Sequence, residues 1–124
     1  MPRHPIIKVV NKLRDKFPPA YPVKIVFNKN INSSCLGLCT LVKQGRKSIF
    51  RISLTDYLNN YPDEYQDLAS SVMLESLIHE WAHALNWSHL HDNNEEHPIH
   101  DETWGVWYAK LYNYIFYEIK DPWI

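Results

Sequence analysis

The feature that most constrains this chain is a run of apolar residues between positions 68 and 85. Its members recur at steps of three and four residues: Leu68, Val72, Leu74, Leu77, Ile78, Trp81, Ala82 and Leu85. A period near 3.6 predicts one amphipathic helix of about five turns, with an apolar face against a core. The same helix carries His79, Glu80 and His83 in the stretch HEWAH. The neighbouring positions on the histidine face are small or polar, which leaves space there for a ligand.

The segments before this helix predict a smaller helix and a sheet. Residues 5–17 have apolar side chains at helical spacing, and Pro18-Pro19 must end that helix. Residues 21–28, YPVKIVFN, alternate as a short strand. A hairpin is predicted next, with arms Leu36–Val42 and Ser48–Ser53 joined by a turn over Lys43–Lys47.

A final helix is predicted from Asp101 onward, with Trp104, Tyr108, Leu111 and Ile115 on one stripe that packs against the long helix. The predicted order is helix, three-stranded sheet with a hairpin, long helix, loop and helix. This order is typical of an α+β domain. A length of 124 residues fits one domain over residues 1–124.

Composition excludes several classes of protein. No apolar run approaches the roughly 20 residues that would span a bilayer. The start MPRHPIIKVV lacks the apolar segment of a secretory signal. Two cysteines, Cys35 and Cys39, are too few for a disulfide framework, so the expected location is cytoplasmic. On a strand they would lie about 13 Å apart, which favours buried apolar packing over a metal pair.

Charge is divided between the two halves of the sequence. Residues 1–55 contain eleven Lys and Arg against one acid, whereas residues 56–124 contain two Lys against thirteen Asp and Glu. Either the halves face each other in the fold and neutralise, or the first half forms a basic surface that binds DNA or another polyanion. No nucleic-acid-binding motif accompanies the basic residues, which favours the first interpretation.

Two histidines four residues apart on a helix lie side by side and can reach one zinc ion. His79 and His83 have this spacing, and Glu80 lies a quarter turn round the helix, where it can reach a water on the metal. Such a glutamate takes the proton of the water as it attacks a peptide carbonyl, and then delivers the proton to the leaving amine. The alternative is a helix that carries two histidines by chance.

A catalytic zinc needs a third protein ligand, and six of the seven histidines lie between positions 79 and 100. The downstream candidates are His89, His91, His97, His100, Asp101 and Glu102. His100 is favoured, because the start of the final helix would hold it rigidly. Asp101 is the alternative ligand, although it could instead cap that helix. The other three histidines are interpreted as solvated loop residues. Tyr108 could donate to a developing oxyanion, but packing is the simpler role.

These motifs resemble the SprT-like metallopeptidases, which include the Spartan proteases. That family combines HExxH, a loop, and a segment of the form H-G-x-x-W/F. Here the segment reads His100-Asp101-Glu102-Thr103-Trp104. The hairpin stretch LGLCTLVKQGRKSIFRISLTDYL is also similar to the family, and the ending HDETWG resembles small metallopeptidases encoded by bacteriophages. The resemblance covers roughly residues 20–118, and only the two zinc segments are specific.

The resemblance implies a minimal zincin fold, in which a small mixed sheet covers the metal-binding helix. It implies one zinc ion held by His79, His83 and His100, with Glu80 as the general base in the hydrolysis of protein substrates. Asp101 departs from the usual glycine. No zinc ribbon or partner-recruiting tail follows, so DNA-dependent cleavage is left open. Two other functions stay open: a non-catalytic interaction domain that contains zinc, and a nucleic-acid-associated accessory protein.

Overall fold

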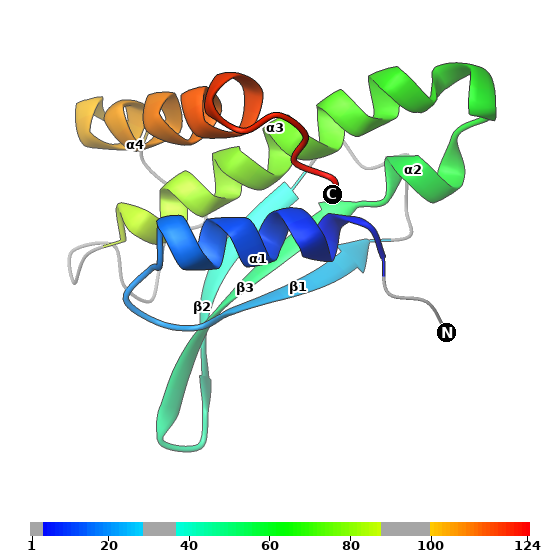
Figure 1. Cartoon of the computed structure of the whole chain (residues 1–124). Coiled ribbons are helices and arrows are strands. Elements are labelled where there is room, and N and C mark those ends of the chain that lie inside the picture. The colour runs from blue at the N-terminus through cyan, green and yellow to red at the C-terminus, as the bar shows by residue number, and fades with distance from the viewer. Residues whose placement is uncertain (1–3, 29–36, 88–99) are drawn as a thin grey trace.

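The computed structural model describes residues 4–28, 37–87 and 100–124. Its helices and strands are, in chain order, α1 (Ile6–Lys16), β1 (Val23–Asn28), β2 (Gly37–Gln44), β3 (Lys47–Thr55), α2 (Tyr57–Asn60), α3 (Gln66–Leu85) and α4 (Glu102–Asn113) (Figure 1). A 3-10 turn precedes α3 at Asp63–Tyr65, and a π-helical turn follows α4 at Tyr114–Glu118. The α+β class is therefore confirmed, with four helices and a three-stranded sheet in the described part of the chain.

The sheet is mixed. Its strand order is β1-β3-β2, with β1 parallel to β3 and β2 antiparallel to β3. The β2–β3 hairpin projects away from the helices in Figure 1. Its turn is shorter than predicted: Gln44 pairs with Lys47, so Gly45 and Arg46 alone form the loop. Gly45 has a φ of 64°, which is the left-handed conformation that two-residue hairpin turns require.

One face of the sheet forms the core. Phe50, Ile52 and Leu54 alternate along β3 and are almost completely buried. They share one cluster with the apolar faces of α1, α3 and α4 and with the π-helical turn after α4. The buried members of these elements include Ile6, Val9, Val10, Leu13, Leu77, Ile78, Trp81, Leu111 and Ile115. The predicted stripe of the final helix is divided, because Leu111 and Ile115 are buried whereas Trp104 and Tyr108 are only half-buried. Leu68 of the long helix is exposed.

The N-terminal residues are tied to the segment that leads into α2. His4 Nε2 lies 2.9 Å from Asp56 Oδ1, and the His4 ring stacks on Phe27 with ring centroids 4.4 Å apart. Asp56 also caps α2 by accepting the Asn59 N–H. Because His4 Nδ1 accepts the Ile6 N–H, the contact with Asp56 is donated from the other ring nitrogen. These contacts fix α1 relative to the end of β3.

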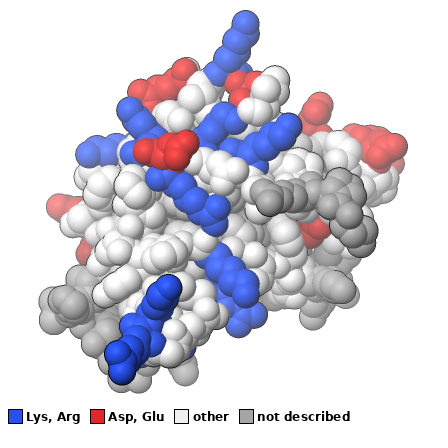
Figure 2. Space-filling model, turned by 60° about the horizontal axis from the view of Figure 1, so that its bottom comes forward, with Lys and Arg blue, Asp and Glu red and all other residues white. Residues whose placement is uncertain are grey.

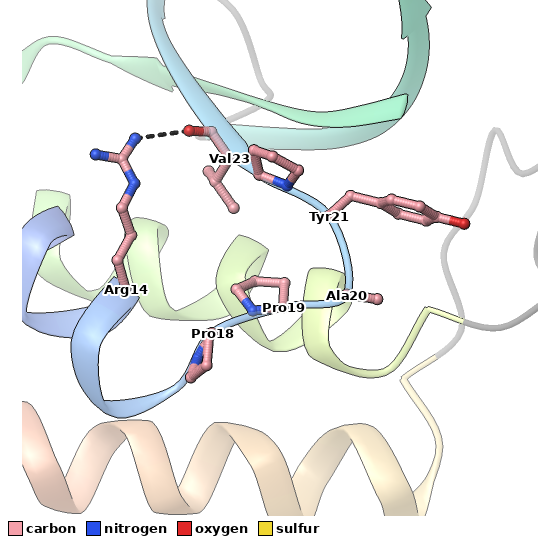
Figure 3. A pocket seen from close by; sticks show the side chains of 7 residues that line it. Arg14, Pro18, Pro19, Ala20, Tyr21 and Val23 are labelled. Atoms are coloured by element: carbon pink, nitrogen blue, oxygen red, sulfur yellow. Dashed lines mark hydrogen bonds between the residues drawn. The ribbon is translucent and has the colours of Figure 1, made fainter. Parts of the chain in front are cut away.

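The loop between α1 and β1 forms a surface pocket of about 300 Å³ (Figure 3). It is lined by Arg14, Pro18, Pro19, Ala20, Tyr21, Pro22 and Val23. Arg14 donates to the carbonyl of Val23 at 2.6 Å across this pocket and so ties the loop to the first strand. None of the histidines at 79, 83 and 100 lines it. Within the described ranges, no helix is long and apolar enough to cross a bilayer.

Candidate metal centre

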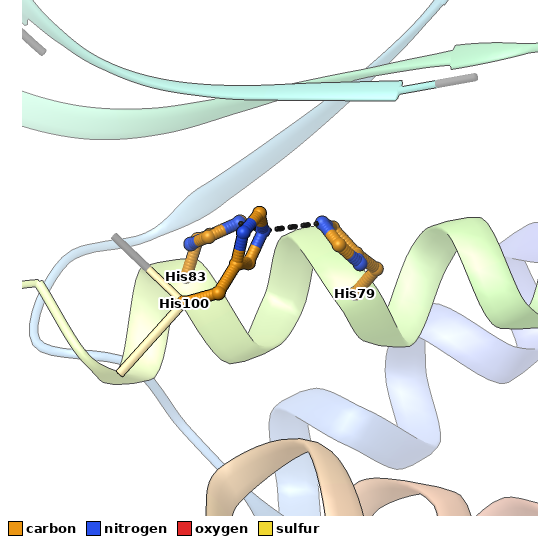
Figure 4. Close-up of side chains that lie close together, drawn as sticks. All are labelled: His79, His83 and His100. Carbon is orange, nitrogen blue, oxygen red and sulfur yellow. Dashed lines mark hydrogen bonds between the residues drawn. The ribbon is translucent and has the colours of Figure 1, made fainter. Parts of the chain in front are cut away.

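Helix α3 places two histidine rings on the same side of the helix. His79 and His83 are four residues apart, and their ring centroids lie 5.0 Å from each other. The start of α4 brings His100 between them (Figure 4). The Nε2 atom of His100 lies 3.0 Å from that of His83 and 3.1 Å from that of His79. Three imidazoles from two distant segments therefore converge on one point.

The three ring nitrogens cannot satisfy one another. An imidazole nitrogen carries either one proton or one lone pair, so His100 Nε2 can make only one of its two short contacts as a hydrogen bond. A cation at the common point would accept a lone pair from each ring. Two nitrogens bound to one tetrahedral zinc are about 3.3–3.4 Å apart, close to the separations observed. His79, His83 and His100 are thus close enough to bind a metal ion.

The chemistry of these donors fits zinc without specifying it. Three neutral imidazoles are a common zinc donor set, and they also suit copper, nickel and iron. Burial, and then the neighbouring His100, lower the pKa of His79 below its ordinary value, which keeps its lone pair available at neutral pH. His83 is buried, whereas His100 is exposed and His79 is half-buried. The cluster is therefore accessible to solvent on one side.

Asp101 fixes the position of His100. Its carboxylate caps α4 by accepting the Trp104 N–H at 2.8 Å, which is one of the two roles that the sequence left open for Asp101. The same oxygen accepts a hydrogen bond from Asn86 Nδ2 at 3.2 Å, which ties the start of α4 to the end of α3. Among the described residues, the group that could hold a metal contains neither Asp101 nor Glu102. The candidates His89, His91 and His97 lie outside the described residues.

Trp104 forms an apolar wall behind the three histidines. Its ring centroid lies 4.9 Å from that of His79, 5.4 Å from His83 and 4.6 Å from His100. Tyr108 stacks on the other side of Trp104 at 5.1 Å. The sequence predicts only that Trp104 packs against the long helix, and its contact with the histidines was not predicted. Its spacing of four residues from His100, on the helix that His100 precedes, was the available signal.

Glu80 lies beside the histidines and not among them. Its Oε2 is 4.0 Å from His79 Nε2, and its carboxylate accepts the backbone N–H of Cys39 on β2. The residue is only 6% exposed. Burial raises the pKa of Glu80 to about 7, although the Cys39 N–H opposes the shift. A carboxyl group with a pKa near neutrality can both take and return a proton at physiological pH.

Two further polar side chains surround this region. Tyr108 lies with its ring centroid 6.2 Å from that of His79. Burial raises the pKa of Tyr108, and Glu75 and Tyr112 add to the shift, so the phenol stays protonated and can donate. Ser76, one turn before Glu80 on α3, has a buried hydroxyl with no partner within the described part of the chain. Cys39 is buried, as expected, and Cys35 lies outside the described residues.

No protein-family model, curated protein or solved structure matches this chain. What the site can do therefore has to be argued from its own geometry. The geometry consists of three convergent imidazoles, an adjacent buried carboxylate and a phenol on the neighbouring helix.

We expect His100→Ala to remove the metal, because two imidazoles on one helix leave the third position without a ligand. Elemental mass spectrometry of untagged protein should find about one zinc per wild-type chain and almost none in this variant. Asp101→Asn is the matched control, because an asparagine keeps the helix cap and removes the charge. Zinc retained in His100→Ala would instead assign the third ligand to Asp101, Glu102 or His97.

The buried Glu80 should make the metal-free protein less stable as the pH rises. Between pH 4.5 and about 7 the folded state holds a proton that the unfolded state has lost, so the free energy of unfolding falls across this window. Glu80→Gln has no charge to bury. Its free energy of unfolding should equal that of the wild type near pH 4 and should be about 3 kcal/mol larger at pH 8.

Chemical denaturation of both proteins, in the presence of a chelator, measures this difference. Glu64→Gln, at an exposed glutamate in the 3-10 turn, controls for the loss of one negative charge. The prediction would be contradicted if the free energies of unfolding of Glu80→Gln and of the wild type differed by the same amount at every pH.

Proposed function

We propose that this protein is a zinc-dependent metallopeptidase with a minimal zincin fold of the SprT-like type, acting on protein substrates. The observation that carries the proposal is the buried carboxylate of Glu80, held 4.0 Å from a ring nitrogen of the three-histidine cluster. A mixed sheet packed against the helix that carries HEWAH also supports it.

The chain's own residues divide the work of hydrolysis between them. A zinc ion held by the three histidines supplies a Lewis acid that lowers the pKa of a water molecule towards about 7. Glu80 takes a proton from the water that attacks the peptide carbonyl, and it returns the proton to the leaving amine. Tyr108, on the adjacent helix α4, would donate to the carbonyl oxygen as negative charge develops there, a role that its closeness to His79 supports. The accessible side of the cluster is where the substrate would enter.

The burial of Glu80 argues against a purely structural metal site. In a structural site, protein ligands fill all four coordination positions of the metal. Such a site does not need a further carboxyl group that does not bind the metal. Burial raises the pKa of Glu80 to about 7, so the ionised carboxylate is unfavourable in the metal-free protein. A large energetic penalty beside a ligand cluster is typical of groups that take part in chemistry.

The catalytic role of Glu80 can be separated from metal binding. Glu80→Gln should keep zinc and fold but lower kcat/KM by about 10²–10⁴-fold, because the amide cannot accept the proton. A mixture of quenched fluorescent peptides, incubated with zinc-loaded protein, measures cleavage. Glu64→Gln should cleave like the wild type. Equal cleavage by Glu80→Gln and wild type would favour the non-catalytic zinc domain.

A second candidate function is association with nucleic acid. The three strands contain Lys24, Lys43, Lys47 and Arg51 but no Asp or Glu. Lys24 and Arg51 are neighbours across β1 and β3, on the face of the sheet opposite Phe50, and both are exposed. Figure 2 shows Lys and Arg side chains down the centre of one face, with Asp and Glu towards its top and sides. The basic half of the chain is therefore not fully neutralised within the fold.

If Lys24, Lys47 and Arg51 contact three phosphates, affinity for duplex DNA should fall about 40-fold between 50 and 200 mM salt. Fluorescence anisotropy with a labelled duplex measures this slope. Replacing Lys24 and Arg51 by glutamate should make the affinity depend less steeply on salt. Lys120→Glu, near the C-terminus, should leave the salt dependence unchanged. Undetectable or salt-independent binding would exclude this second function.

A further inference from the structure

Gly37 is the first residue of β2, and its backbone conformation is one that any residue can adopt. Among the described residues, only Gly45 is a glycine with positive φ. The register runs without interruption from Gly37, opposite Leu54, to Gln44, opposite Lys47, so no bulge explains the residue. Glycine within a strand makes the folded chain less stable than alanine would. A glycine in a regular strand often marks the close approach of another group.

The group that approaches Gly37 is the side chain of Glu80. A Cβ atom added at Gly37 would lie 3.1 Å from Glu80 Cγ and 3.3 Å from Glu80 Oε2. It would also lie 3.2 Å from the carbonyl oxygen of Ser53. All three separations are shorter than ordinary van der Waals contact. The Ser53 oxygen is a backbone atom of β3 and is held by the sheet. The neighbour that can move is therefore the Glu80 side chain.

Cys39, two residues along the same strand, also contacts the Glu80 carboxylate. Its backbone N–H donates to Glu80, as β2 is the outer strand of the described sheet and can donate away from the ladder. Its thiol is buried, and burial followed by the charge of Glu80 raises the pKa of that thiol. Glu80 is thus enclosed by β2 at two points, a hydrogen bond at Cys39 and a missing side chain at Gly37.

We propose that Gly37 is a positioning residue for Glu80: its missing side chain leaves the space in which the carboxylate lies against β2 beside His79. The proposal rests on the proposed function, since it assigns to Gly37 the placement of the general base. A methyl group at this position would move the Glu80 side chain by a few tenths of an ångström or turn it away from the Cys39 N–H. Misplacing a catalytic group by about 1 Å can slow a reaction about 10²-fold.

Gly37→Ala tests the placement, and the chain offers a matched control. A Cβ atom at Gly105 in α4 would have no atom within 4 Å, so Gly105→Ala makes the same chemical change in open space. In the zinc-loaded protein, Gly37→Ala should lower kcat by about tenfold or more with KM within about twofold. Zinc content should stay at the wild-type value, because the three histidines are untouched. An unchanged kcat, or an equal loss in Gly105→Ala, overturns the proposal.

A double-mutant cycle in metal-free protein tests the contact without reference to activity. Gly37→Ala should lower the melting temperature by about 4 °C in the wild type and by clearly less in the Glu80→Ala background. Glu80→Ala removes the two Glu80 atoms that the new methyl group would meet, whereas the contact with the Ser53 carbonyl is the same in both backgrounds. Equal shifts in the two backgrounds would show that Gly37 does not place Glu80, and would overturn the proposal.

The two arms also separate failure of this inference from failure of the proposed function. A wild-type protein that binds zinc and cleaves nothing refutes the peptidase assignment and the catalytic purpose of the contact together. The melting-temperature cycle then still decides whether the space at Gly37 sets the position of Glu80. Active wild-type protein with no coupling in the cycle refutes the inference about Gly37 alone.

Discussion

The packing of α3 across the sheet is the interaction on which the site depends. One side of this helix buries Leu77, Ile78 and Trp81 against the core, where they lie with Phe50 and Ile52 of β3. The burial is extensive enough to fix the rotation of the helix about its own axis, because close-packed interiors tolerate little displacement. The positions of His79 and His83 follow from that rotation. Any metal bound to the two histidines is therefore placed by the hydrophobic core.

The same packing brings Glu80 against β2 and creates a conflict between stability and chemistry. A buried carboxylate is unfavourable when ionised, and here a single backbone N–H from Cys39 compensates only in part. The chain accommodates the side chain by placing glycine at position 37, which leaves the necessary space. Natural sequences depart from the locally most stable choice mainly at functional sites. Glu80 and Gly37 form one such departure, shared between a helix and a strand.

The third histidine reaches the site through a polar contact between helix ends. Asp101 caps α4 and accepts a hydrogen bond from Asn86 at the end of α3. These two contacts hold His100, the preceding residue, close to the two histidines of α3. Trp104, three residues beyond the cap, then packs on all three imidazole rings. Asp101 thus has a structural role in holding the cluster together.

Local pattern in the sequence was sufficient for α1, α3, α4, the three strands and the pair His79 and His83, because period and spacing are properties of neighbouring residues. The short helix α2 was not predicted, and the cap at Asp101 was one of two roles that the sequence left open. Local pattern was less accurate for the hairpin turn, where strand pairing extended to Gln44 and Lys47. Only the tertiary structure decided the parallel pairing of β1 with β3, the meeting of His100 with the helical histidines, and the contact between Gly37 and Glu80. Each of these joins segments far apart in the chain, and such contacts are selected by the packing of the whole core.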